Sequence, residues 1–182
     1  MVDQSVTFNY ITAISGAVIF TWILHEFTHW ITSESLGYES ILRLNSVSAA
    51  DGQQRTDWHK MYISASGPII TILQAIFAFK VLRTKGWNKF IYPILFTPLY
   101  MRSLAGAMNL INPNDEGRIS DFLGIGLFTL SIIVCGLLFF LVFKTSRKYG
   151  LNWKFNFWTT IVIMAVSSII ILSDQFIGIR IL

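Results

Sequence analysis

The chain has few charged residues and a single cysteine. Only 13% of its 182 residues are Asp, Glu, Lys or Arg, whereas 53% are hydrophobic and 15% are aromatic. A soluble domain of this size cannot cover so much apolar surface with one core. The lone Cys135 cannot form a disulfide within the chain. The composition therefore excludes a disulfide scaffold and an ordinary soluble domain, and it predicts a membrane protein.

Five apolar segments are separated by short polar connections, and each is near the length of about 20 residues that a membrane-spanning helix requires. They cover residues 8–32, 61–82, 90–111, 119–143 and 155–171. No repeat is evident, and no stretch is long enough for a second domain. We therefore expect an all-α membrane protein with about five transmembrane helices in a single polytopic domain over residues 1–182. Gly124 and Gly126, within the fourth segment, are expected at close helix contacts.

The longest connection, residues 33–60, is mostly polar. Its stretch from Ile41 to Ser48 alternates partly between apolar and polar residues, which permits a short β-strand or hairpin after the first helix. An irregular surface loop fits this weak pattern equally well. If the stretch is a strand near a catalytic site, its open edge can pair with an extended substrate segment.

Positive charge is concentrated in two connections. Their basic residues are Lys80, Arg83, Lys85 and Lys89 in one, and Lys144, Arg147, Lys148 and Lys154 in the other. With five crossings both connections lie on the side of the N-terminus. The positive-inside rule then predicts a multi-pass protein of the cell membrane whose N-terminus is cytoplasmic. Topology and contact with the lipid bilayer account for the net charge of +4, and we expect no nucleic-acid partner.

Histidine is scarce too, and two of the three histidines share one motif. His25-Glu26-Phe27-Thr28-His29 lies inside the first apolar segment. On a helix this spacing places both imidazoles on one face beside Glu26, which offers two zinc ligands and a general base. Ionisable groups within a membrane segment need a partner or a water-filled cavity, and a metal ion is such a partner. The alternative is polar residues that fill the interior of a helix bundle.

Zinc catalysis requires a third protein ligand and an open position for water. His25 and His29 lie roughly 25 Å along the first helix, near the side of the membrane where the third segment ends. The candidate third ligands are Asp115, Glu116 and Asp121 after that segment, His59 before the second, and Glu34 or Glu39 in the long connection. His59 is more simply explained as a histidine at the membrane interface.

Three segments together resemble the site-2 protease family of intramembrane zinc metalloproteases. They are the motif of residues 25–29, Ser66-Gly67-Pro68 at the second span, and Asn109 followed by Asp115-Glu116-Gly117-Arg118. The resemblance covers about two thirds of the chain and implies a metalloprotease-like core at about residues 8–126, with extra helices to residue 182. Glu116 stands where the family usually has glycine. The family's active site usually faces the cytosolic half, whereas the basic connections here place the site nearer the outside.

The resemblance implies a zinc metalloendopeptidase that hydrolyses peptide bonds in or near membrane-spanning segments of protein substrates. The implied roles are His25, His29 and Asp115 as ligands of Zn²⁺, Glu26 as the catalytic carboxylate, and Asn109 as an aid to substrate binding. Asn112 and Arg102 are further candidates for contact with substrate. For Arg102, pairing with an acid near the site and snorkelling to the membrane surface are alternatives. The alternative function is a non-catalytic membrane subunit of a larger assembly that keeps a structural zinc site.

Overall fold

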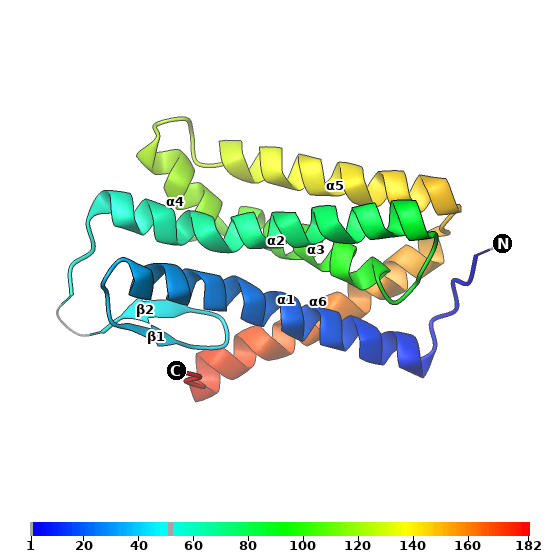
Figure 1. The fold of residues 1–182 in the computed structure, drawn as a ribbon, viewed down its shortest axis with the longest axis horizontal. Helices are drawn as coiled ribbons and strands as arrows, with labels where there is room; N and C mark the ends of the chain where they lie inside the picture. The colour runs from blue at the N-terminus through cyan, green and yellow to red at the C-terminus, as the bar shows by residue number, and fades with distance from the viewer. Residues whose placement is uncertain (1, 51–52) are drawn as a thin grey trace.

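A computed structural model describes residues 2–50 and 53–182, and within these ranges the chain forms six helices and one hairpin (Figure 1). The elements are α1 (Phe8–Ser35), β1 (Ser40–Leu42), β2 (Val47–Ala49), α2 (Asp57–Lys85), α3 (Tyr92–Met108), α4 (Asp115–Phe122), α5 (Thr129–Tyr149) and α6 (Trp153–Ile177). Among the described helices, α1, α2, α5 and α6 are long and apolar enough to cross a membrane. The prediction of an all-α membrane protein with a short hairpin after the first helix is confirmed.

Three of the long helices begin after a residue whose side chain caps the first turn. The side-chain oxygens of Thr7, Thr56 and Asn152 accept hydrogen bonds from backbone N–H groups of α1, α2 and α6. Such caps satisfy amides that have no partner within the helix. Each of these helices contains one of the predicted apolar segments, at residues 8–32, 61–82 and 155–171, and extends a few residues beyond it.

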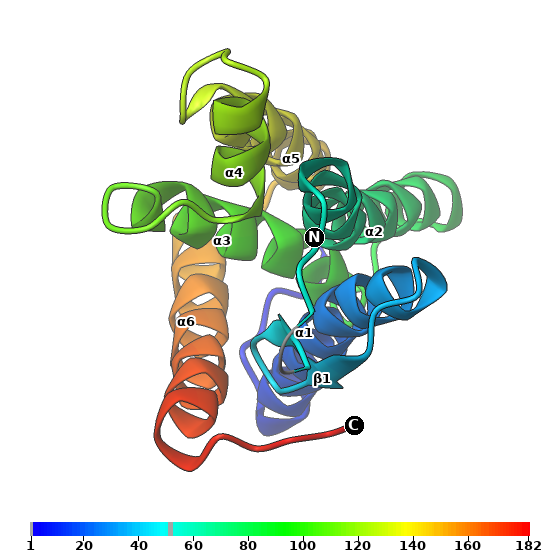
Figure 2. The ribbon, with the colours of Figure 1, turned by 90° about the vertical axis from the view of Figure 1, so that its left-hand side faces the viewer.

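The central helix of the bundle is α3, which has 17 residues and contacts each of the other five described helices (Figure 2). It lies within the predicted third segment but ends at Met108 rather than at Ile111. Tyr92, Leu95 and Met101 on this helix are buried and belong to the main apolar core. Because α3 packs against all the other described helices, it can present polar side chains to the interior of the bundle.

The predicted fourth span over residues 119–143 is wrong in its boundaries. The structure has two helices there, α4 and α5, joined by a turn over residues 123–128. Gly124 and Gly126 have φ angles of +66° and +92° in this turn. They therefore provide left-handed backbone conformations rather than the helix contacts that we expected from their small size.

The hairpin pairs β1 and β2 in antiparallel register, with Ile41 opposite Ser48. The C-terminal segment covers the outer edge of β1, because Leu42 N–H donates to the carbonyl of Leu182 at 3.0 Å and Ile181 N–H donates to the carbonyl of Leu42 at 2.8 Å. Residues 51–52 of the long connection lie outside the described ranges. The hairpin lies beside the C-terminal end of α1 (Figure 1).

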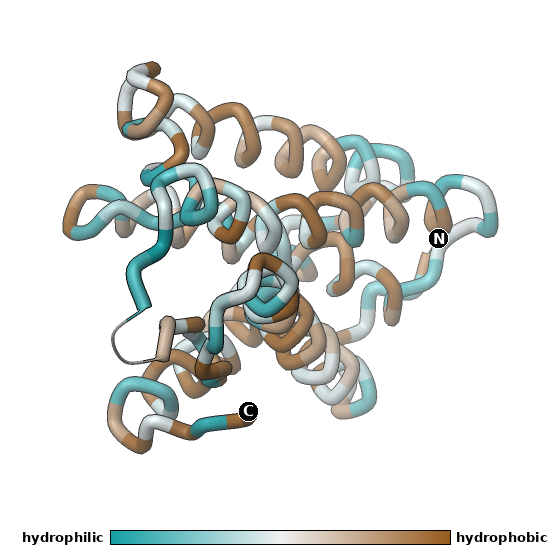
Figure 3. The backbone as a smooth tube through the Cα atoms, turned by 60° about the vertical axis from the view of Figure 1, so that its left-hand side comes forward, coloured by the Kyte–Doolittle hydropathy of each residue, from teal (hydrophilic) through white to brown (hydrophobic). Residues whose placement is uncertain are grey.

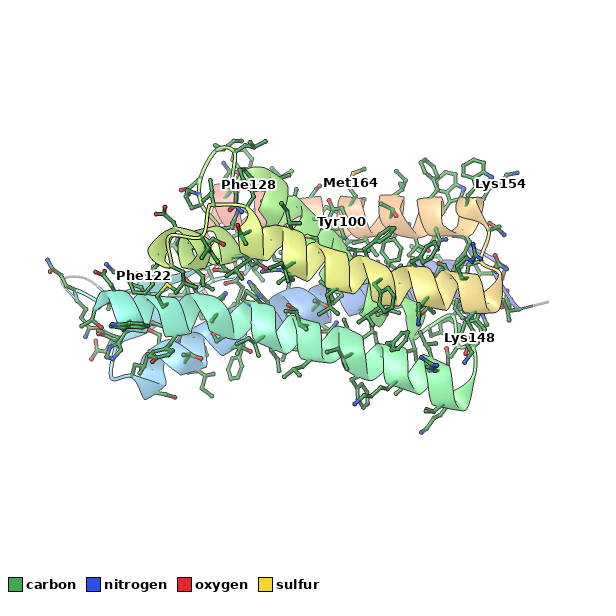
Figure 4. All side chains as sticks on the ribbon, turned by 90° about the horizontal axis from the view of Figure 1, so that it is seen from above. Tyr100, Phe122, Phe128, Lys148, Lys154 and Met164 are labelled. Carbon is green, nitrogen blue, oxygen red and sulfur yellow. The ribbon has the colours of Figure 1, made fainter. Side chains whose placement is uncertain are left out.

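Polar residues gather at both ends of the elongated bundle, and hydrophobic residues follow the middle of its helices (Figure 3). Lys148 and Lys154 lie at one end, opposite Phe122 at the other (Figure 4). The N-terminal segment is held at the basic end, where Lys89 Nζ lies 2.6 Å from a carboxylate oxygen of Asp3. Hydrogen bonds from Lys89 and Ser5 hold the pKa of Asp3 well below its usual range. The hairpin, α4 and the C-terminus lie at the other end (Figure 1).

Candidate metal centre

Helix α1 has one face toward the protein interior and one that is exposed. Its inward face carries His25, Glu26 and His29, which are 4%, 6% and 6% exposed. Phe27 and Ile31 are exposed on the opposite side. The spacing of four residues brings Nε2 of His25 and Nε2 of His29 to 3.1 Å from each other. The motif that was predicted on one helical face therefore converges on one point inside the bundle.

The second helix orients the ring of His29. Nδ1 of His29 lies 2.5 Å from the carbonyl oxygen of Ile63, and Ser66 Oγ lies 3.3 Å from the same nitrogen. Because a carbonyl only accepts hydrogen bonds, Nδ1 of His29 carries a proton and donates a hydrogen bond to the carbonyl oxygen of Ile63. When this imidazole is neutral, its lone pair is on Nε2, which faces His25.

Gly67 lets the backbone of α2 approach both histidines. A Cβ atom built on Gly67 would overlap Cε1 and Nδ1 of His25 and Nε2 of His29. Pro68 follows within the helix, and the hydroxyl of Thr71 donates to the carbonyls of Gly67 and Pro68. The Ser66-Gly67-Pro68 segment thus forms the wall of the site behind the imidazoles.

Asp115, the first residue of α4, completes the group. Its Oδ2 lies 3.3 Å from Nε2 of His25 and 3.3 Å from Nε2 of His29. His25, His29 and Asp115 thereby place three potential metal ligands within reach of one ion, although 85 residues separate His29 from Asp115 in the chain. Asp115 has this position because the turn after α3 directs α4 back toward α1 and α2.

Asn109 supports that turn instead of facing the site. Its Oδ1 accepts from the backbone N–H of Asn114 at 2.7 Å, and its Nδ2 donates to Ser131 Oγ at 3.0 Å. Gly117 permits this arrangement, since a Cβ there would meet Oδ1 of Asn109 at 2.5 Å. Both polar atoms of the Asn109 side chain are therefore engaged within the chain, which differs from the expected contact with substrate.

The other candidates from the sequence lie away from the three ligand atoms. Asn112 and Asp121 are exposed. His59 Nδ1 is hydrogen-bonded to the hydroxyl of Tyr38 at 2.7 Å, and the carboxylate of Glu34 accepts a hydrogen bond from the backbone N–H of Ser40. Among the residues that the structure describes, neither Glu34 nor Glu39 belongs to a metal-binding group.

Arg102 and Glu116 lie beside the ligands as a buried ion pair. Arg102 Nη1 is 3.2 Å from Oε1 of Glu116 and 3.5 Å from Oδ2 of Asp115, and Arg102 Nη2 is 3.4 Å from Nε2 of His25. Arg102 and Glu116 are only 3% and 2% exposed. Arg102 thus pairs with Glu116 and, at a longer distance, with the neighbouring candidate ligand Asp115.

A cavity of about 520 Å³ opens next to these groups. Its lining includes the three candidate ligands, Glu26 and Arg102 from the helices, and Asn45, Ser46 and Val47 from the hairpin. A cavity of this volume accommodates a few residues of an extended peptide. The cavity extends from the hairpin to the candidate metal ligands and Glu26.

The distances and charges of the group fit a divalent cation. Tetrahedral ligands about 2.0–2.1 Å from zinc are about 3.3–3.4 Å from one another, close to the 3.1, 3.3 and 3.3 Å between the ligand atoms here. With neutral imidazoles, the carboxylates of Glu26, Asp115 and Glu116 and the guanidiniums of Arg102 and Arg118, which both lie beside Asp115, leave a formal charge of −1. Negative charge in a buried site is costly, and a bound dication offsets it.

No protein-family model, no curated protein and no solved structure matches this chain. The structure itself shows a membrane protein with four described helices of spanning length. It also shows a group of two histidines and one aspartate that could hold a metal ion.

Proposed function

We propose that the protein is an intramembrane zinc metalloprotease that cleaves peptide bonds in or near membrane-spanning segments of other proteins, as in the site-2 protease family. The observation that carries this proposal is the triangle of His25, His29 and Asp115 with the carboxylate of Glu26 beside it in one cavity. Two neutral imidazoles and one carboxylate are a donor set of catalytic zinc sites, which leave one position open.

Zinc, when bound, polarises a carbonyl group and lowers the pKa of water toward about 7. Glu26 follows His25 directly in the chain and lines the same cavity, so its carboxylate can take a proton from water and return it to the leaving amine. His25, His29 and Asp115 provide the ligands, and the hydrogen bond from His29 to Ile63 keeps one imidazole in the tautomer that binds metal.

The hairpin supplies a docking edge for substrate in this proposal. The C-terminal segment covers the outer edge of β1, and within the described residues the sheet has only two strands, so the outer edge of β2 is unpaired. Val47 on β2 lines the cavity. An extended substrate segment can add to β2 through backbone hydrogen bonds. A substrate helix has to unwind first, because its peptide groups are satisfied internally, and we therefore expect substrates with helix-weakening residues near the cleavage site.

We further propose that the N-terminus lies in the cytoplasm and that the protein belongs to the cell membrane. The basic connections lie at the same end of the bundle as the N-terminus (Figures 1 and 4). The positive-inside rule assigns this end to the cytoplasm. The metal centre, which lies toward the hairpin end, is then nearer the outer side.

The test compares the wild type with Glu26→Gln in lipid nanodiscs. Bound zinc is measured in both, and both are incubated with a panel of single-span substrates that carry Gly, Pro or Asn pairs in the span. We expect about one zinc per chain in both proteins and cleavage by the wild type alone.

The outcomes separate the protease from its alternative. Cleavage that survives in Glu26→Gln would contradict the assigned role of Glu26. Zinc that stabilises the wild type against heat, combined with the absence of cleavage across the panel, would instead favour a structural zinc site in a non-catalytic subunit. The latter is the second candidate because His25 and Asp115 come from different helices, which a metal would hold together.

A further inference from the structure

We propose that Arg102 is a catalytic residue that binds the carbonyl oxygen of the scissile peptide as negative charge develops on it, and that Glu116 positions Arg102 for this task. The inference rests on the proposed proteolytic function. It adds a cationic group on α3 to the metal ligands and the general base on α1 and α4.

The guanidinium is aimed at the ligand atoms. Nη2 of Arg102 is 3.4 Å from Nε2 of His25, and Nη1 is 3.5 Å from Oδ2 of Asp115. The two N–H-bearing nitrogens therefore lie along one side of the ligand triangle and at the wall of the cavity. A carbonyl oxygen that lay in the cavity on this side of the ligand triangle would come within hydrogen-bonding reach of the same guanidinium.

The burial of Arg102 needs an explanation beyond the pairing of charges. A guanidinium that is 3% exposed within a membrane bundle carries a large desolvation penalty. Glu116 offsets its charge at 3.2 Å, and Asp115, which is also a candidate metal ligand, lies 3.5 Å from the same nitrogen. Among the described residues, Nε of Arg102 and Oε2 of Glu116 have no hydrogen-bond partner. The pair is thus incompletely satisfied, and Arg102 retains donors for a further acceptor.

Glu116 is suited to hold this cation in place. It follows Asp115 in the first turn of α4, so the helix that supplies a metal ligand also supplies the counterion of Arg102. A donor fixed before the reaction begins needs no reorganisation as charge develops, which is the basis of oxyanion stabilisation. The charge of Glu116 also offsets that of Arg102, so the presence of Arg102 does not oppose the binding of a dication.

In the reaction, the oxygen of water forms a bond to the carbonyl carbon and Glu26 accepts the proton of that water. The π electron pair of the carbonyl moves to its oxygen, which receives a hydrogen bond from Arg102. When the C–N bond breaks, the electron pair returns to form the carboxyl group, and the proton held by Glu26 goes to the amine. Water and a peptide bond thereby yield a carboxylic acid and an amine, with no change in the charge of Arg102.

The test uses the full protein loaded with Co²⁺, whose visible absorption reports binding without turnover. The probe is a phosphinic peptide in which an anionic tetrahedral phosphinate replaces the scissile carbonyl, and a peptide thiol that ligates the metal serves as the control ligand. We expect Arg102→Met to bind the phosphinic peptide about 100-fold more weakly while Co²⁺ content and thiol affinity stay unchanged. Arg102→Lys and Glu116→Gln are expected to lose about 10-fold, because a charge remains but its donors are displaced.

Equal affinity of the wild type and Arg102→Met for the phosphinic peptide, with Co²⁺ bound in both, would overturn the role of Arg102 and leave the metal site intact. Failure of the wild type to bind Co²⁺ would overturn the metal site and this inference together. If Arg102→Met does not fold, Arg102→Lys and Glu116→Gln decide the question, because both retain a polar group at the buried position. Unchanged phosphinate affinity in both of these variants would refute the proposal.

Discussion

Gly67→Ala tests whether close contact between α2 and the two imidazoles creates the metal site. A Cβ on residue 67 overlaps both rings, and each ring would have to move by about 1 Å to reach ordinary van der Waals contact. Distances between zinc and its ligands tolerate a deviation of only about 0.2 Å. We therefore predict that Gly67→Ala loses high-affinity zinc binding while the helices of the bundle remain folded.

The expected magnitude follows from the cost of overpacking. Inserting one methyl group into a packed site costs about 1–3 kcal/mol. If the rings return to the ligand positions when zinc binds, this cost is taken from the binding free energy, and each 1.4 kcal/mol corresponds to about a tenfold change. The dissociation constant for zinc is thus expected to rise by about 10- to 100-fold. Competition with a chelator measures it in detergent, and the zinc-induced increase in Tm provides a second readout.

Gly16→Ala is the matched control on helix α1. A Cβ on Gly16 has no atom within 4 Å, so the substitution has room. It is expected to leave zinc affinity unchanged and to favour the helix by up to about 1 kcal/mol. A Gly67→Ala protein that binds zinc as tightly as the wild type would refute the inferred contact between the α2 backbone and the ligands.

Three further predictions concern the third ligand, the membrane orientation and the basic end. Asp115→Ala is expected to weaken zinc binding by about 100-fold or more, and full retention of zinc would exclude Asp115 as a ligand. In a cysteine-free background, a membrane-impermeant maleimide applied to intact cells should label Gln53→Cys but not Lys154→Cys; the reverse pattern would invert the proposed topology. Because the pKa of Asp3 is lowered by Lys89, its contribution to stability is complete above its ordinary value of 3.8 and declines as the pH falls below it. Asp3→Asn should therefore show a smaller decrease in Tm than the wild type between about pH 5 and pH 3, and equal decreases would contradict this reasoning.

The long apolar segments sufficed to predict three helices because twenty apolar residues have few alternatives to a spanning helix. The break between α4 and α5 was missed for a related reason. Leu123, Ile125 and Leu127 keep that stretch apolar, and hydropathy does not register the left-handed turn at Gly124 and Gly126. Two glycines spaced by one residue were the available signal.

The spacing of four residues between His25 and His29 was enough to place both imidazoles on one face of α1. The sequence could not predict what orients the two rings. The acceptor for His29 is the backbone carbonyl of Ile63, and any residue type can supply a backbone carbonyl. The pairing of Arg102 with Glu116 joins α3 to α4 through a turn, which helical periodicity cannot predict. The sequence could not predict the role of Asn109 either, because that role depends on the direction in which its side-chain amide points.

Helix α1 separates the candidate metal centre from the surrounding lipid by its own width. His25 and His29 face inward, whereas Phe20, Ile23 and Phe27 on the same helix are exposed. A helix with its side chains is about 10–12 Å across. A paramagnetic ion held by the histidines would therefore lie close enough to the acyl chains to enhance their magnetic relaxation, so that the bilayer itself would report whether the centre is occupied.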